Sequence, residues 1–169
     1  MTVEQAIKTA LGYETKVRDV YAEAVEHATD QVGKRIFQVL ADEEQQHVKY
    51  LQNRLDEWKR TGMVTAVSLD TGIPSRETIA NGVSKLKARM SDEDHGGELQ
   101  MLRKALDVEI ETSNFYKKMV SELPAEGQQM FARFVEIEEG HLAIVQAEID
   151  YVSGTGFWFD FREFDLEAA

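Results

Sequence analysis

The sequence predicts an all-α protein, an antiparallel bundle of four long helices in two hairpins, joined by one long crossover. Three observations support this fold class. Only 2 of the 169 residues are proline and 30% are charged, which is typical of long helices with a solvated face. Apolar residues recur at helical spacing in four stretches. Short links join the first pair and the last pair of stretches, whereas residues 62–97 separate the two pairs.

The first helical hairpin is expected between Thr2 and Thr61. Thr2-Val3-Glu4-Gln5 has the pattern of a capping box, in which the hydroxyl and the amide side chain satisfy free backbone amides. Asp30 is the expected cap of the second helix, and Gly62 the residue just past its end. The side chains expected on or beside the inward stripes are Ile7, Leu11, Glu14, Val17, Tyr21, Val25 and Ala28, then Phe37, Leu40, Glu44, His47, Leu51, Leu55 and Trp58.

Residues 62–75 are predicted to form a loop and residues 76–90 a short extra helix, followed by an Asp/Gly-rich break at 91–97. The third long helix is expected over residues 98–122. The fourth is expected to begin at Pro124, a residue suited to a first helical turn, and to reach Val152. Their inward side chains are Leu102, Leu106, Glu109, Tyr116, Val120 and Leu123, then Phe134, Glu138, His141, Val145 and Val152.

We therefore divide the chain into a bundle, residues 1–153, and an aromatic C-terminal tail, residues 154–169, which is not a separate domain. Two glycines, Gly154 and Gly156, are expected to end the last helix, and five aromatic residues follow between positions 157 and 164. Each aromatic ring buries about 150–250 Å² when it is covered, so this tail is not expected to stay in water. It either folds back over the end of its own bundle or packs on a second subunit in a two-fold dimer.

The two predicted hairpins repeat each other in the polar residues of their inward stripes. A glutamate precedes a tyrosine by seven positions in each half, and a Glu-x-x-His motif follows in each half. The two halves are offset by 95 residues for the Glu–Tyr pair and by 94 residues for the Glu-x-x-His motif. The residues in register are Glu14 with Glu109, Tyr21 with Tyr116, Glu44 with Glu138, and His47 with His141.

This repeat predicts a dinuclear metal site. Ionised carboxylates without partners would cost many kcal/mol each in an apolar core, against a net stability of about 5–15 kcal/mol for a domain. Two divalent ions would balance four carboxylates, and two neutral imidazoles would complete the ligand set. Glu and His three residues apart on a helix project from one face, so both reach the same ion. The expected metal ligands are Glu14, Glu44, His47, Glu109, Glu138 and His141. For Tyr21 and Tyr116 two interpretations remain open, a core tyrosine that needs a hydroxyl partner and a donor to a ligand carboxylate.

Composition excludes several other classes of protein. Nineteen basic and 31 acidic residues give a net charge of −12, which disfavours nucleic acid and anionic membranes as partners. The chain has no cysteine, which excludes disulfides, iron–sulfur clusters and a rubredoxin-type iron site within it. No uncharged stretch approaches the ~20 residues of a membrane span, and the amino terminus lacks a signal-peptide pattern. We expect a soluble, cytoplasmic protein.

At these motifs the chain resembles the rubrerythrin-related branch of the ferritin-like superfamily, over about residues 3 to 152. The resemblance implies a ferritin-like bundle in which Glu44 and Glu138 bridge two ions and Glu14 and Glu109 are terminal ligands. It also implies one histidine per ion and iron as the usual metal, although manganese or zinc suits the same ligands. The chain departs from rubrerythrins in two ways. It has no rubredoxin domain, and Thr112 stands where rubrerythrins carry an extra glutamate, with Val17 at the matching place in the first half. The remaining six ligands also resemble those of bacterioferritins.

The function expected first is that of a di-iron oxidoreductase, peroxidase-like, which reduces hydrogen peroxide or dioxygen. Tyr21 and Tyr116 are its candidate hydrogen-bond donors beside the ligands. A separate electron donor such as a rubredoxin, and a homodimer or larger homo-oligomer, are its expected partners. Two alternatives stay open: a ferroxidase that stores or delivers iron, and a module that metal stabilises without catalysis.

Overall fold

The computed structural model describes residues 1–86, 96–155 and 158, and this part of the chain forms five α-helices and no β-strand. Four helices are long: Val3–His27 (α1), Gln31–Thr61 (α2), Gly96–Glu122 (α4) and Ala125–Thr155 (α5). The fifth, Arg76–Leu86 (α3), is short and lies between α2 and α4 in the sequence. The prediction of an all-α fold is confirmed. Residues 87–90 of the predicted short helix lie outside the described residues.

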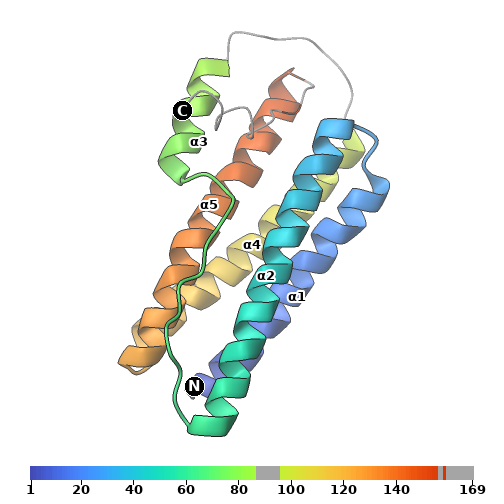
Figure 1. The fold of residues 1–169 in the computed structure, drawn as a ribbon. Helices are drawn as coiled ribbons and strands as arrows, with labels where there is room; N and C mark the ends of the chain where they lie inside the picture. Colours follow the sequence, from blue (N-terminus) through green and yellow to red (C-terminus); the bar gives the residue numbers. More distant parts are fainter. Residues whose placement is uncertain (87–95, 156–157, 159–169) are drawn as a thin grey trace.

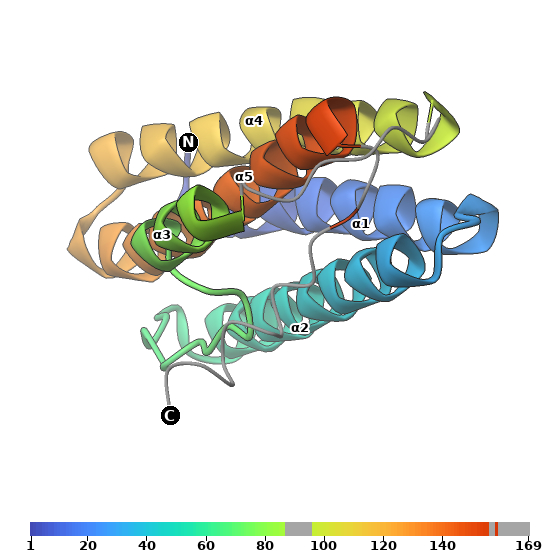
Figure 2. The same cartoon turned by 90° about the horizontal axis from the view of Figure 1, so that it is seen from above.

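The long helices pack as two neighbouring pairs. α1 and α2 lie side by side, as do α4 and α5, and α1 contacts α4 across the molecule (Figures 1 and 2). α3 packs on the outside of α5. None of the described helices combines the length and the apolarity that crossing a bilayer requires. The result is a helical bundle built from two neighbouring helix pairs.

The helix ends follow local chemistry. Thr2 and Gln5 form the predicted capping box at α1, with bonds of 3.0 and 3.2 Å. The Asp30 carboxylate accepts from the Val32 and Gly33 amides, 2.7 and 3.0 Å away, and so caps α2. Gly62 ends α2 with φ = 70°, a left-handed conformation that favours glycine.

Two helix ends in the second half differ from the expectation. α5 begins at Ala125, and the Pro124 carbonyl accepts its first bond from the Gln128 amide at 2.9 Å. Proline therefore stands just before the helix instead of in its first turn. α5 also runs past Val152 to Thr155, so Gly154 is helical and does not end it.

The crossover passes between α2 and α5 on its way to α3 (Figures 1 and 2). Its backbone is tied to both helices. The Tyr50 hydroxyl of α2 donates to the Val67 carbonyl at 2.8 Å, and Arg133 Nε of α5 donates to the Leu69 carbonyl at 2.9 Å. A Cβ added to Gly140 would lie 3.4 Å from the Pro74 carbonyl, so the crossover also approaches α5 closely beside His141.

Two apolar clusters form the core, one towards each end of the bundle. One contains Phe37, Leu40, Leu102 and Val145, and the other Leu51, Leu55, Met119, Phe131 and Phe134. Within each long helix the core residues change from one cluster to the other around a buried glutamate. On α1, for example, Ala10 belongs to one cluster and Val17 to the other, with Glu14 between them. The polar residues therefore occupy the middle of the bundle.

Candidate metal centre

The six predicted ligands come together in the middle of the bundle, and all are buried. Glu14, Glu44, Glu109, Glu138 and His141 have no exposed surface, and His47 is 1% exposed. α1 and α4 each supply one glutamate, whereas α2 and α5 each supply one Glu-x-x-His motif. Helical periodicity places the two residues of each motif on one face, because positions three apart are neighbours on a helix.

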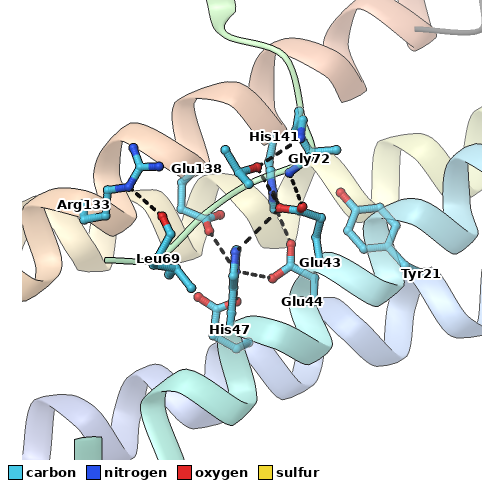
Figure 3. A network of polar contacts seen from close by, with 12 residues as sticks. Tyr21, Glu43, Glu44, His47, Leu69, Gly72, Arg133, Glu138 and His141 are labelled. Atoms are coloured by element: carbon cyan, nitrogen blue, oxygen red, sulfur yellow. Dashed lines mark hydrogen bonds and ion pairs between the residues drawn. The ribbon is translucent and has the colours of Figure 1, made fainter. Parts of the chain in front are cut away.

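The histidines face the carboxylates with the same ring nitrogen (Figure 3). His47 Nδ1 lies 3.0 Å from Glu44, 3.2 Å from Glu14 and 3.7 Å from Glu138. His141 Nδ1 lies 2.7 Å from Glu44 and 3.6 Å from Glu109. The two imidazole rings are stacked at 5.3 Å between centroids and 11° between planes. One nitrogen of each ring is thus aimed at a shared set of carboxylate oxygens.

Two groups of four residues each have their ligand atoms within 4.8 Å of one another. One group is Glu14, Glu44, His47 and Glu138, and the other is Glu44, Glu109, Glu138 and His141. Glu44 and Glu138 belong to both groups. Three carboxylates and one imidazole around one point form a ligand set that suits iron, manganese or zinc. The described side chains therefore provide two adjacent places that fit a divalent ion.

The electrostatics show the effect of gathering these acids in one place. Burial, followed by repulsion from Glu44, raises the pKa of Glu14 to about 8. Burial, followed by repulsion from Glu109, raises the pKa of Glu138 well above its ordinary range. Burial alone would lower the pKa of His47, but the carboxylates of Glu44 and Glu14 outweigh it and raise that pKa to about 10. Without added cations, the cluster therefore retains protons at neutral pH.

Several buried atoms of the cluster lack hydrogen-bond partners among the described residues. They include both carboxylate oxygens of Glu138 and Oε2 of Glu109. A buried acceptor without a donor costs about 1–3 kcal/mol, and more when it is charged. Metal ions bound by these oxygens would remove that cost. The donor set and its unsatisfied atoms therefore fit a dinuclear centre.

Each of the two tyrosines donates to an expected ligand glutamate of the opposite half. The Tyr21 hydroxyl donates to Glu109 Oε1 at 2.5 Å, and the Tyr116 hydroxyl donates to Glu14 Oε1. Burial, followed by the neighbouring carboxylates, holds the pKa of both phenols well above 10, so both remain donors. Each tyrosine is therefore a buried core residue with a hydroxyl partner, and that partner is one of the expected ligand carboxylates.

Thr112 and Val17, one helical turn after Glu109 and Glu14, are both buried. The Thr112 hydroxyl donates to the Val108 carbonyl of its own helix at 2.9 Å. Its side chain is therefore already engaged within α4. The carboxylates that the two four-residue groups gather remain the four predicted from the repeat.

The sequence reasoning missed Glu43, the residue before Glu44. Its carboxylate lies on the far side of the histidine rings, 3.5 Å from His141 Nε2 and 4.0 Å from His47 Nε2. The side chain is 14% exposed, and it accepts bonds from Thr71 and Gly72 of the crossover. One signal was available, because Glu43 precedes His47 by four residues and so shares its helix face. The contacts with the crossover have no signature in the sequence.

Comparison of the chain with protein-family models, with curated proteins and with solved structures found no match.

Proposed function

We propose that this chain is a dinuclear metal protein of rubrerythrin type, a di-iron oxidoreductase that reduces hydrogen peroxide or dioxygen. The observation that carries the proposal is the pair of buried four-residue groups that share Glu44 and Glu138. Glutamates that belong to both groups suit bridging ligands, and Glu14 and Glu109, each in one group, suit terminal ligands. Each group contributes one histidine, aimed through Nδ1.

Two ferrous ions held by these ligands would supply one electron each, which is what the reduction of an O–O bond by two electrons requires. Hydrogen peroxide takes up two electrons and two protons and gives two molecules of water. The protein residues contribute a preorganised, dry environment: the six ligands are at most 1% exposed. Tyr21 and Tyr116 orient the terminal carboxylates by donating to them.

The proposal includes the finer features of the fold. We assign the four long helices to an antiparallel, ferritin-like bundle, in which the crossover joins the two hairpins. The short link between α1 and α2, the short link between α4 and α5, and the helix pairs in Figure 1 support this assignment. Electrons would come from a separate carrier such as a rubredoxin, because the chain has no cysteine and so no rubredoxin-type iron site of its own. We also propose a homodimer or larger homo-oligomer.

The direct test combines metal analysis with rapid kinetics. Protein purified without added metal is analysed for iron, manganese and zinc, and the diferrous form is then mixed with hydrogen peroxide or dioxygen in a stopped-flow instrument. We expect two ions per chain and faster oxidation by peroxide than by dioxygen. Protein that binds two ions but reacts with neither oxidant would leave only a metal-stabilised module.

A second candidate function is ferroxidation for iron storage or delivery. Thr112 favours it, because its hydroxyl is bonded within α4 and leaves six ligands, the number that resembles a bacterioferritin site. This function predicts faster oxidation by dioxygen and uptake of iron well beyond two ions per chain. A large closed assembly in solution would support mineral storage, whereas a simple dimer would argue against it.

A further inference from the structure

Glu43 and the crossover form a second layer around the two histidines. Each imidazole presents Nδ1 to the ligand carboxylates and Nε2 to the opposite side, where Glu43 lies (Figure 3). Glu43 Oε2 is 3.5 Å from His141 Nε2 and 4.0 Å from His47 Nε2. A single carboxylate therefore stands against the outer edge of both rings.

The crossover holds this carboxylate in place. The Gly72 amide donates to Glu43 Oε1 at 2.5 Å, and the Thr71 hydroxyl donates to Oε2 at 2.8 Å. The Thr71 hydroxyl also accepts from the Ile73 amide at 3.1 Å, which fixes the turn that presents it. The position of Glu43 thus depends on a segment that the sequence places between the two halves of the bundle.

The second half of the bundle offers no equivalent acid. The offset of 94 residues that relates the two Glu-x-x-His motifs places Ile137 opposite Glu43. Ile137 is apolar and 2% exposed, and it belongs to one of the two apolar clusters. The ligands are therefore repeated, but the acid behind the histidines is not. Glu43 faces both of them.

We propose that Glu43 is a positioning residue shared by His47 and His141, and that the crossover sets its place. This proposal rests on the dinuclear metal centre. A carboxylate behind a ligating histidine accepts the second ring N–H, which fixes the tautomer and makes the other nitrogen a better ligand. Loss of such a partner typically weakens metal binding 10- to 100-fold. One carboxylate behind both rings makes the binding of both ions depend on the crossover.

Glu43→Gln tests the proposal, because the amide keeps the shape but has one oxygen fewer. The Gly72 amide donates to Oε1, so the glutamine oxygen should keep that position. The NH₂ group would then replace Oε2, which accepts from Thr71 and faces Nε2 of both histidines, and an NH₂ group cannot accept there. Cobalt(II) titration, followed by its visible spectrum, measures affinity and ligand geometry together. We expect both cobalt ions to bind 10- to 100-fold more weakly in the variant, with a changed spectrum.

Glu57→Gln is the matched control. Glu57 also lies on α2 and also accepts bonds from the crossover, from the Thr65 amide at 3.2 Å and the Thr65 hydroxyl at 2.7 Å. It takes part in none of the ion pairs of His47 or His141. The same substitution there should leave cobalt affinity and spectrum unchanged. An equal effect of both substitutions would mean that they act through the general stability of the crossover, and would overturn the proposal.

Histidine side-chain NMR of the zinc-loaded protein measures the ring tautomer and the exchange of the ring N–H with water. A purely structural role of Glu43 would change neither of them. Wild-type protein should show both rings with the proton on Nε2, and Glu43→Gln should exchange that proton faster with water. If Glu43→Gln does not fold, Thr71→Val carries the test, with cobalt binding expected to weaken severalfold. Unchanged affinity and unchanged exchange in the folded variant would refute the role of Glu43 while leaving the metal centre intact.

Two further results distinguish failure of the proposed role of Glu43 from failure of the dinuclear centre. If wild-type protein binds no cobalt, the dinuclear centre itself fails. Glu43, His47 and His141 also form a group whose ligand atoms lie within 4.8 Å of one another. A third cobalt ion per chain that Glu43→Gln alone removes would make Glu43 a ligand, and would overturn its role as a positioning residue.

Discussion

Replacing Glu138 with glutamine should abolish most of the stabilisation by metal, whereas replacing Glu109 should abolish half of it. Glu138 belongs to both four-residue groups and Glu109 to only one. Both are fully buried glutamates of the second half of the bundle, in α5 and α4. Glutamine can still accept the hydrogen bond from Tyr21 at position 109. The two variants therefore differ mainly in the number of ions that each residue serves.

The expected sizes follow from the mass-action relation between binding and stability. At a free metal concentration 100 times Kd, each ion stabilises the folded state by about 2.7 kcal/mol, so two ions add about 5.4 kcal/mol. A domain of this size gains about 2–4 °C in Tm per kcal/mol, which gives about 11–22 °C for the wild type. If each ion that loses a ligand binds 100-fold more weakly, it retains only about 0.4 kcal/mol. The metal-induced gain then falls to about 2–3 °C in Glu138→Gln and about 6–12 °C in Glu109→Gln.

Scanning calorimetry under anaerobic conditions, with and without ferrous iron, measures these gains for each variant against its own metal-free form. The metal-free Glu138→Gln protein should unfold near the wild-type temperature. Burial, followed by repulsion from Glu109, raises the pKa of Glu138 well above its ordinary range, which favours the neutral carboxylic acid that glutamine resembles. Equal losses in the two variants would refute the assignment of Glu138 as a shared ligand, and full retention in both would refute the metal centre.

Three further outcomes are expected. The folded-state pKa values of Glu14, about 8, and His47, about 10, exceed their ordinary 4.5 and 6.5, so the metal-free folded state holds extra protons. Its unfolding free energy should therefore fall as pH rises from 6 to 9, measured by urea denaturation at each pH, and should stay flatter with metal bound. Trp158→Ala should lower the free energy of unfolding by about 3 kcal/mol, measured by urea denaturation, because the indole is only 7% exposed. Gly33→Ala should displace the same indole, since a Cβ at position 33 would lie 2.4 Å from the ring. An unchanged urea midpoint in both variants would mean that the tail does not dock on its own bundle. Tyr21→Phe should cost about 1–3 kcal/mol in the metal-free protein, measured in the same assay, because it removes the donor to Glu109.

The C-terminal tail illustrates what could and what could not be predicted from the sequence. Five aromatic residues in a short stretch predicted that the tail is covered, but not by what. In the structure the Trp158 indole packs on Phe37 at 5.1 Å between centroids and donates to Glu98 at 3.0 Å. Glu98 also accepts from the Thr29 and Asp30 amides, so it ties the tail to the link between α1 and α2. For Trp158 this agrees with a tail that folds back, and the other four aromatic residues lie outside the described residues.

The buried cluster of six Glu and His side chains was predictable because each residue depends on local periodicity and on a repeat. Glu44 and His47 share a helix face, their counterparts do so 94 residues later, and apolar neighbours show that the face points inward. Glu43 was not predictable in the same way. Its contacts join α2 to a loop 28 and 29 residues further along and to a histidine on α5. Contacts of this kind depend on the path of the crossover, which no periodic pattern specifies.

The six expected ligands are repeated but their surroundings are not, so two ions bound by them would be inequivalent. Thr112 lies one turn from Glu109 on α4, whereas Val17 occupies the matching place after Glu14 on α1. Glu43 lies closer to His141 than to His47, 3.5 Å against 4.0 Å. The half that contains His141 and Glu109 therefore has the more polar environment, and Glu43 lies nearer to its histidine. Because a carboxylate behind a histidine strengthens the metal bond, the ion at His141 should be the tighter of the two. The crossover, which meets α5 at Gly140 and α2 at Glu43, is the element that creates this asymmetry in an otherwise repeated bundle.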